Sequence, residues 1–535
     1  MIPPVSPTRR VIAMRVVAPV LLLITLLTWG LASAVGASPD DDFHLASIWC
    51  GHGDNPPGCE AGDSADSRAV NTALVTDAVC FAFNADASAG CQGQDFPTNF
   101  DEVTVTDRGN FGGLYPPVFY WTMSWLVGDN IELSVLAVRA ANVAIFAALV
   151  VTLFWLLPPV RRPTLVWSIA LTFVPLSVYL VPSTNPSSWA VISAATLWIA
   201  LIGYFETSGK RRVGLAVIAL AATVLGAGAR ADAALFAILA IGLVIILTFR
   251  RERVYFLQAI LPIVLVIIAG LLFLTARQSG AAVTGLAPID NDLVVNPFTL
   301  AIANLVNLPS LWIGIFGFWP LGWLDTAMPS GVWVPAFAAF IGAVFLGLHL
   351  RVPRKGLVLA IVAFALVVFP VVLLVRSQSM VGANFQPRYL LPLMIILAGL
   401  LLLSQRDARP QLAPTAVWLV VIALSVANAI ALHTQIRRYV TGVDGAGINL
   451  DSNLEWWWQL PITPMATWIV GSIAFATLLA IINTRSWNGE APYVRDRRLS
   501  PSQSLPHLLS DDARSADTKM RNDAADIMPE ARSPL

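Results

Sequence analysis

Long apolar runs separated by short charged junctions are the main pattern of this chain. A helix needs about 20 apolar residues to cross a bilayer, and twelve runs approach or reach that length. The predicted spans cover residues 12–36, 131–158, 163–181, 188–206, 213–229, 232–249, 254–275, 332–350, 356–375, 389–404, 413–433 and 464–483. The pattern predicts an all-α polytopic integral membrane protein with about 12 transmembrane helices.

Basic residues at alternate junctions predict the orientation of these spans, because Lys and Arg concentrate in cytoplasmic loops. They are Arg9, Arg10, Arg15, Arg161, Arg162, Lys210, Arg211, Arg212, Arg250, Arg251, Arg253, Arg351, Arg354, Lys355, Arg406 and Arg409. We therefore expect a cytoplasmic N-terminus (1–11), an extracytoplasmic first loop (37–130) and a multi-span domain (131–483). Both termini would be cytoplasmic.

Two further apolar segments fit this topology only if they do not cross the membrane. A crossing at 297–318 would invert every later loop, so we predict a re-entrant or interfacial helix there. Residues 114–128 are aromatic, interrupted by proline and too short to span. We predict that they form an interfacial helix, since Trp and Tyr concentrate at membrane surfaces.

The two ends of the chain differ in character. The first run has small residues suited to signal-peptide cleavage (Ala32, Ala34 and Ala37), but its apolar stretch is longer than the usual 7–15 residues. We predict a retained anchor, with a cleaved signal peptide as the alternative. Residues 484–535 are rich in Pro, Ser, Asp and Arg, which predicts a disordered cytoplasmic tail.

Composition excludes several classes of protein. The 535 residues are 56% hydrophobic and 12% charged, with a mean hydropathy of +0.70, whereas soluble globular proteins carry roughly 25% charged residues. The 33 basic and 33 acidic residues cancel and no basic block stands out, so nucleic acid is not an expected partner.

All four cysteines lie in the first predicted extracytoplasmic loop. Cysteines in such a setting usually form disulfides, and four of them allow three pairings. We predict the two short loops, Cys50–Cys59 and Cys80–Cys91. A zinc site with His44 and His52 is the alternative, although the spacing matches no standard pattern.

The segment Pro39-Asp40-Asp41-Asp42-Phe43-His44 follows the first span and is the first candidate for chemistry. A carboxylate at the membrane surface is suitably placed to act as a general base toward a hydroxyl group. In a helix, Asp40 and His44 would share a face. The alternative is an acidic run that marks a solvated helix end.

Four arginines lie at the predicted outer ends of spans, against the positive-inside tendency: Arg230, Arg277, Arg376 and Arg388. A planar guanidinium suits a phosphate, and lipid phosphates lie at this depth. Asp232 offers Arg230 a structural partner, whereas no partner for Arg388 is evident from the sequence. The third candidate is Asp325, which follows Trp323 in an aromatic segment that suits either a sugar ring or an interfacial belt.

Several catalytic signatures are absent from the sequence: no GxxxxGK[ST], GxSxG or HExxH motif is present. The span interiors also carry almost no Asp, Glu or Lys, which disfavours an ion-coupled carrier.

Five short motifs occur in an order that resembles a known family. They are Pro39-Asp40…His44, Tyr115-Pro116-Pro117-x-Phe119-Tyr120, Asn185-Pro186-Ser187, Gly322-Trp323-Leu324-Asp325-Thr326 and Gln386-x-Arg388-Tyr389-Leu390-Leu391-Pro392. Together they resemble the bacterial membrane-protein family catalogued as domain of unknown function 2142. That family is similar to the GT-C superfamily of membrane glycosyltransferases, so the resemblance implies a GT-C-like fold in a bacterial plasma membrane.

The resemblance also implies roles for individual residues. Asp40, with Asp41 as the alternative, would be the general base, and His44 would orient it or contact the acceptor. Arg388 would hold the donor phosphate, with Arg230, Arg277 and Arg376 as further candidates. Substrate contacts would come from Tyr115, Trp323, Asp325, Gln386 and Tyr389. The family's usual acidic pair is Asp-Glu, whereas this chain has Asp40-Asp41, and the cysteine-bearing insert at 50–91 also departs from the family pattern.

The expected function is transfer of a sugar from a polyprenyl-phosphate donor to an envelope glycan or a protein at the outer face. No cofactor is predicted, no metal ligand set is evident, and use of a divalent metal is left open because some GT-C enzymes use one. The alternatives are a flippase or exporter of a lipid-linked envelope precursor, and a non-catalytic scaffold of an envelope-synthesis complex. Each alternative has the lipid bilayer as a partner.

Overall fold

Helices make up most of this computed structural model. It describes residues 7–53, 58–98, 102–280, 296–348, 352–383, 385–403 and 413–483, without the side chains of 7–15 and Pro97. The long helices are α1 (Pro7–Leu31), α5 (Ile131–Leu156), α8 (Ser187–Glu206), α9 (Gly209–Ala229), α10 (Ala231–Thr248), α12 (Ile260–Leu274), α14 (Pro297–Ile313), α15 (Ser330–Gly347), α16 (Pro353–Arg376), α18 (Pro414–Val440) and α19 (Pro464–Ile482). Shorter ones are α2 (Asp41–Trp49), α3 (Thr72–Val75), α4 (Val118–Met123), α6 (Arg162–Leu171), α7 (Val178–Leu180), α11 (Arg253–Gln258) and α17 (Leu391–Leu402).

The helices agree with most of the predicted spans. Within the described ranges, ten helices are long and apolar enough to cross a membrane, or eleven if one bent pair counts as a span. Nine of them match predicted spans, with α11 and α12 together matching 254–275. The structure therefore supports ten to eleven candidate spans in this part of the chain, against about twelve predicted. The predicted runs 12–36 and 389–404 correspond to shorter apolar helices among the described residues, Val16–Leu31 of α1 and Leu391–Leu402.

The predicted span 163–181 is not one continuous helix. It is divided into α6, a π-helical turn at Phe173–Ser177 (η7) and α7, and the chain bends by 83° between the two halves. Pro175 lies at the break, where it cannot donate a backbone hydrogen bond. The break is buried, which satisfies the rule that irregular backbone at membrane depth must be covered by protein.

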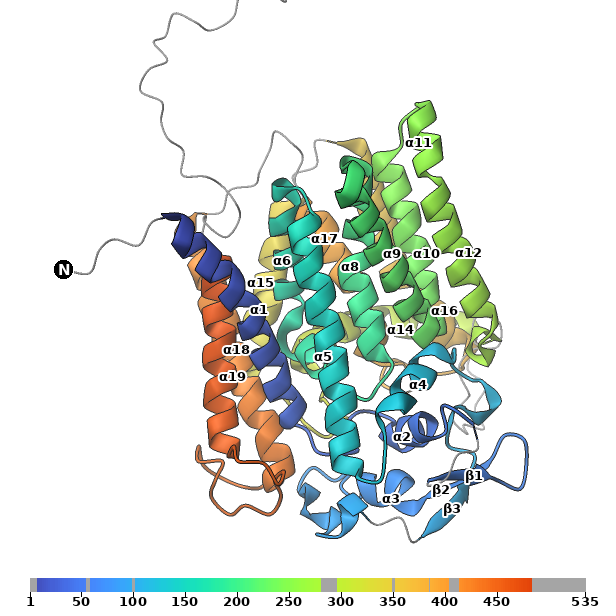
Figure 1. The fold of residues 1–535 in the computed structure, drawn as a ribbon, viewed down its shortest axis with the longest axis vertical. Coiled ribbons are helices and arrows are strands. Elements are labelled where there is room, and N and C mark those ends of the chain that lie inside the picture. The colour runs from blue at the N-terminus through green and yellow to red at the C-terminus, as the bar shows by residue number, and fades with distance from the viewer. Residues whose placement is uncertain are drawn as a thin grey trace, which may run out of the picture. The chain divides into compact units, whose positions relative to one another are not determined.

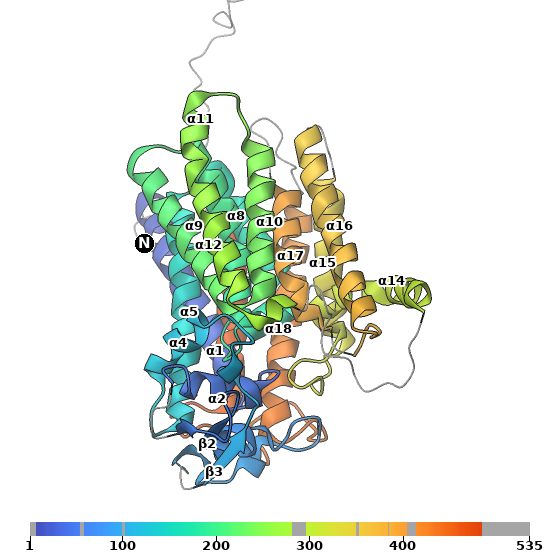
Figure 2. The same cartoon turned by 90° about the vertical axis from the view of Figure 1, so that its right-hand side faces the viewer.

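Helix α14 covers the segment predicted to be re-entrant or interfacial. With the π-helical turn η9 (Gly314–Phe318), it meets the length and composition of a span. However, Figure 2 shows it lying across the direction of its neighbours α15 and α16. Its exposed apolar positions, among them Phe298, Ile302 and Val306, lie on one face.

The two disulfide loops lie at one end of the helix bundle, with α2, α3, α4 and a small sheet (Figure 1). We call this end the disulfide end. The sheet is antiparallel, in the order β1 (Cys59–Ala61), β2 (Arg68–Asn71) and β3 (Val103–Thr106). The expectation of an all-α chain was therefore wrong for this part.

The structure has the disulfides Cys50–Cys59 and Cys80–Cys91, which confirms the predicted pairing. The zinc alternative is wrong, because all four thiols are used in these bonds.

Basic junctions lie at the opposite end of the bundle. The start of α9, which carries Lys210, Arg211 and Arg212, and the start of α11 both lie far from the disulfide end (Figure 1). This segregation of charge agrees with the pattern from which the orientation was predicted. Residues 484–535, predicted to be a disordered cytoplasmic tail, lie outside the described residues.

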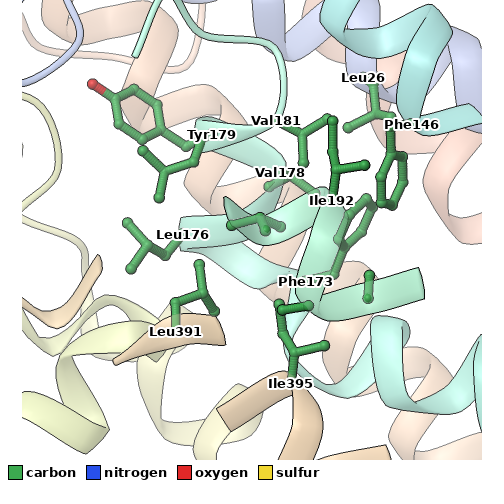
Figure 3. Close-up of a cluster of buried hydrophobic side chains, with 14 of the residues drawn as sticks. Leu26, Phe146, Phe173, Leu176, Val178, Tyr179, Val181, Ile192, Leu391 and Ile395 are labelled. Atoms are coloured by element: carbon green, nitrogen blue, oxygen red, sulfur yellow. The ribbon is translucent and has the colours of Figure 1, made fainter. Parts of the chain in front are cut away.

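The core is centred on the interrupted segment η7–α7. Figure 3 shows Leu26 of α1, Phe146 of α5, Ile192 of α8 and Ile395 of α17 gathered around Phe173. Helix α8 is the most enclosed candidate span, with 94% of its most apolar window buried. The interrupted segment is thus held from several sides, and it positions one wall of the site described next.

Candidate functional site

A strained turn places Asp40 at the disulfide end of the bundle. Asp40 has a φ of 59° and directly precedes α2, whose first amides His44 N–H and Phe43 N–H donate to the Asp40 carbonyl. A non-glycine residue in this left-handed region costs about 1 kcal/mol or more. Asn185 holds the turn, since its Nδ2 donates to the Pro39 carbonyl at 2.9 Å.

Asp41 is a structural residue of this turn. Its side chain is fully buried and accepts hydrogen bonds from the Ser38 amide (2.9 Å) and from the hydroxyl of Thr184 (2.6 Å). Burial raises the pKa of Asp41 to about 6, although these two hydrogen bonds and the charge of Arg139 oppose the rise. Of the two candidate bases, Asp41 is therefore enclosed, and Asp40 is the one that solvent reaches.

Asp40 is paired with Arg388, for which the sequence suggested no partner. Arg388 Nη2 donates to Asp40 Oδ2 at 2.6 Å and also contacts the hydroxyl of Tyr389 at 3.1 Å. The Asp40 side chain is 41% exposed, whereas that of Arg388 is 4% exposed. Burial alone would raise the pKa of Asp40, but Arg388, with His44 and Arg108, lowers it to about 2.

Two donor atoms of Arg388 remain unused. Among the described residues, Nε and Nη1 have no hydrogen-bond partner although both are buried. Leaving buried donors of a charged group unpaired costs several kcal/mol unless something satisfies them. This makes Arg388 a candidate for binding an anion.

Arg388 lines a cleft built from elements far apart in the sequence. Its other walls come from the interrupted segments, η7–α7 (Leu176, Tyr179 and Leu180) and η9 (Gly314), and from the turn at Gly322 and Leu324. Pro39, next to Asp40, and the predicted contact Gln386 also line it. The empty volume is about 350 Å³, including space open to solvent.

Arg230, Tyr389 and Tyr115 lie beside this pair. The guanidinium carbons of Arg230 and Arg388 lie 5.0 and 5.1 Å from the centre of the Tyr389 ring, and Arg230 lies 5.6 Å from the Tyr115 ring. The predicted pairing of Arg230 with Asp232 is confirmed by contacts of 2.9 Å from Nε and Nη2. Arg230 is thus largely satisfied within the protein.

His44 lies in the same aromatic group and is a neutral residue. It is buried on α2, and its Nδ1 is hydrogen-bonded to the hydroxyl of Tyr120 at 2.8 Å. Burial lowers the pKa of His44 to about 3; Asp40 opposes the fall, while Arg388, Arg230 and Arg108 add to it. His44 is therefore neutral at physiological pH, and its ring packs against Tyr115 at 5.7 Å.

Asp325 and Trp323 have structural partners that the sequence did not indicate. Asp325, the acidic candidate of the aromatic segment, pairs with the fully buried Arg438 at 2.7 Å. Trp323 is buried and donates to the Gly36 carbonyl at 2.8 Å. Neither side chain is among the residues found to line the cleft with Arg388.

The remaining predicted arginines lie elsewhere. Arg277 is exposed and pairs at 3.3 Å with Asp66, which is also exposed. Arg376 is exposed at the end of α16. Neither is among the described residues that line the cleft.

Arg139 and Arg438 are two of the buried arginines that escaped the sequence reasoning; Arg437 is a third. Arg438 lies in the last turn of α18. Arg139 lies inside α5, where it donates to the carbonyls of Gly30, Ser33 and Ala34 at the end of α1. Both carried the signal that drew attention to Arg388: a cation at the predicted outer part of an apolar helix.

In the described part of the chain, no cluster of three or more His, Cys, Asp or Glu side chains is arranged to hold a metal ion. No curated protein and no solved structure matches the chain. A family model described as "Predicted membrane protein (DUF2142)" matches residues 23–397, which is more than half of the chain and includes Asp40 and Arg388. The chain therefore belongs to this family of polytopic membrane proteins of unknown function.

Proposed function

We propose that this protein is a GT-C-like glycosyltransferase that takes a sugar from a polyprenyl-phosphate donor and transfers it to an envelope glycan or protein. The observation that carries the proposal is the Asp40–Arg388 pair. A partly exposed carboxylate lies 2.6 Å from a buried guanidinium whose Nε and Nη1 have no partner in the described residues. One group can accept a proton, and the other can bind a phosphate.

In the proposal, the disulfide end faces the aqueous space outside the cytoplasm. Disulfides persist in oxidising compartments, and the basic junctions at the opposite end suit the cytoplasmic side. The donor phosphate lies against Nε and Nη1 of Arg388, a planar fork that suits phosphate oxygens.

Donor binding also prepares the base. A pKa of about 2 makes Asp40 a weak base in the resting pair. A phosphate that binds Arg388 compensates its positive charge and adds negative charge nearby, and both changes raise the pKa of Asp40. The carboxylate thus becomes a stronger base when the donor is in place.

The transfer step then balances as follows. Asp40 takes the proton of the acceptor hydroxyl while the acceptor oxygen bonds to the anomeric carbon with inversion. The bond from that carbon to the phosphate oxygen breaks, and the polyprenyl phosphate leaves with the electron pair. Arg388 stabilises the charge that grows on the leaving phosphate.

Asp40 and Asp42 provide a matched pair of variants for the test. A strain that lacks the protein is complemented with wild type, Asp40→Asn or Asp42→Asn, and lipid-linked sugars and envelope glycans are quantified by mass spectrometry. Asp42 is the control, because its carboxylate is held by Arg108 in a bidentate pair away from the cleft. We expect Asp40→Asn to accumulate the donor and lose a specific sugar, while Asp42→Asn restores both. Normal glycans with Asp40→Asn would refute the base assignment.

Arg388→Lys tests the phosphate role separately. Lysine can still pair with Asp40, but it lacks the planar fork that Nε and Nη1 provide. We expect a folded protein whose donor binding is weakened about tenfold or more. Unchanged binding of polyprenyl-phosphate sugar in nanodiscs would contradict the assignment.

One observation favours a second candidate, a flippase or exporter of a lipid-linked precursor. Two interrupted helices, α6–α7 and α14–η9, meet beside Arg388, and such breaks also line substrate sites in transporters. The Asp40→Asn variant distinguishes the two, because moving a lipid requires no general base.

A further inference from the structure

An exposed phenylalanine at the disulfide end is held more firmly than an ordinary loop residue. The side chain of Phe83 is 75% exposed. It lies in a loop closed by the Cys80–Cys91 disulfide, so it is not one of the lipid-facing residues of an apolar helix. Its φ of 62° places it in the left-handed region, which a bulky residue adopts only when its surroundings impose it.

Hydrogen bonds from Arg438 hold the backbone of this loop. The two Nη atoms of Arg438 donate to the carbonyls of Phe81 (2.9 Å), Asn84 (3.1 Å) and Ala87 (2.5 Å), so the carbonyls on both sides of Phe83 are fixed. The amide of Val443 adds a hydrogen bond to the Ala85 carbonyl at 3.0 Å. The loop is therefore a rigid support for an exposed ring.

Trp323 sets the direction of that ring. The Phe83 and Trp323 rings meet edge to face, with centres 5.2 Å apart, and the indole is fixed in turn by the Gly36 carbonyl. Trp323 lies between Gly322 and Leu324, which both line the cleft with Arg388. The exposed ring thus packs on Trp323, whose two neighbours in the chain line the cleft.

The surroundings of Phe83 suit a neutral polar ligand better than a membrane surface. The loop from Cys80 to Cys91 contains no Lys or Arg that would pair with lipid phosphates, and its single charge is Asp86. Asn84 and Asp86 are exposed on either side of Ala85. An exposed ring followed within three residues by an exposed amide and an exposed carboxylate suits a sugar, which presents C–H groups on one face and hydroxyl groups at its edge.

We propose that Phe83 is a stacking platform for the acceptor, and that the acceptor is a glycan and not a protein. This inference rests on the proposed function and extends it: the phosphate-linked sugar enters on the Arg388 side of the cleft, and the acceptor glycan lies across Phe83. Its hydroxyl group then reaches Asp40 past the turn that contains Leu324.

The test measures binding and not transfer. Full-length protein in nanodiscs is titrated with a panel of neutral hexose, pentose and N-acetylhexosamine oligosaccharides, and with Ser/Thr-containing peptides, by saturation-transfer NMR. The variants are Phe83→Ala, Phe83→Leu and Phe83→Trp, and Val105→Ala serves as a matched control, since Val105 is a 50% exposed residue on β3. Leucine keeps an apolar side chain but removes the ring.

We expect one oligosaccharide class to bind wild type, Phe83→Trp and Val105→Ala alike, and to bind Phe83→Ala and Phe83→Leu about tenfold more weakly or worse. Wild-type affinity in Phe83→Leu would overturn the platform, as would peptide binding that depends on Phe83, or a panel in which no oligosaccharide binds wild type. Asp40→Asn separates the two proposals, because it should bind the oligosaccharide normally and fail only in transfer.

Discussion

Replacing Arg438 with methionine should detach the Cys80–Cys91 loop from the helices while most of the fold persists. The guanidinium is fully buried and bonds three loop carbonyls and the carboxylate of Asp325, whose side chain is 4% exposed. Removing one partner of such a pair typically costs about 3–5 kcal/mol, because a buried charge is left uncompensated. The lost carbonyl bonds act in the same direction.

Hydrogen exchange at residues 81–87 measures this loss directly. Since 1.4 kcal/mol corresponds to a factor of ten, 3 kcal/mol predicts that protection of these amides falls by about a hundredfold. Amides of α8, in the enclosed core, should keep their protection. The control is Arg277→Met, which removes a guanidinium from an exposed pair at the same end of the bundle, where ion pairs contribute about 1 kcal/mol or less.

A second variant tests the cause. Asp325→Leu removes the carboxylate but leaves Arg438 its three carbonyl acceptors, so it should cost less than Arg438→Met. The double variant should cost less than the sum of the two. The reasoning is refuted if protection at 81–87 stays within fivefold of wild type in Arg438→Met, or if the two substitutions are additive.

Three other predictions concern stability. Burial raises the pKa of Asp41 from 3.8 to about 6. Its stabilising contribution is therefore present below pH 4 and is lost as the pH rises through 6. The free energy of unfolding from denaturant titrations should fall by up to about 3 kcal/mol over this range, and Asp41→Asn should abolish this pH dependence. Gly399→Ala should lower the thermal midpoint, because a Cβ there would lie 2.0 Å from an indole carbon of α8, whereas Gly270→Ala, with open space, should not. Replacing Cys80 and Cys91 by serine should cost about 3 kcal/mol in denaturant titrations, the loop entropy of an 11-residue separation.

Local patterns predicted the parts of this structure that depend on neighbours in the sequence. Nine spans follow from apolar runs alone, and the Cys50–Cys59 and Cys80–Cys91 disulfides follow from the preference for short loops. The Arg230–Asp232 pair was predictable because its members are two residues apart. Each of these inferences needs only a short stretch of chain.

The errors in the fold have local physical causes. The run 163–181 is mostly apolar and carries no charged residue, so its composition predicts a span, yet the chain bends at Pro175 and the break is covered by other helices. The small sheet β1–β3 was missed because its strands have only three or four residues, too few for a clear alternating pattern.

The candidate site was only partly predictable, since its partners are far apart in the sequence. Asp40 and Arg388 were each selected from local motifs, but 348 residues separate them, and nothing local indicates that they pair. The same is true of Asp325 and Arg438, which are 113 residues apart. Sequence reasoning therefore selected both members of the Asp40–Arg388 pair but only Asp325 of the Asp325–Arg438 pair. It predicted that Asp325 contacts a substrate, whereas in the structure Asp325 has a buried partner.

The buried arginines of the disulfide end show why Arg388 is the one suited to a ligand. Arg230 donates from Nε and Nη2 to the carboxylate of Asp232. Arg139 donates from both Nη atoms to backbone carbonyls. Arg438 donates from both Nη atoms to three carbonyls and to the carboxylate of Asp325. At least two of the three nitrogen atoms of these three arginines are therefore satisfied within the protein. Arg437 is also buried and, among the described residues, donates only from Nη2, to the carbonyls of Gly447 and Asn449, but it does not line the cleft. Arg388 uses Nη2 alone, and its two other nitrogens have no partner in the described residues. Because burying a cation is costly, a guanidinium left incomplete beside a cleft is best explained by an anion that completes it. In the proposed transfer, Asp40 would be the base beside this anion site, because its carboxylate pairs with the same guanidinium at 2.6 Å.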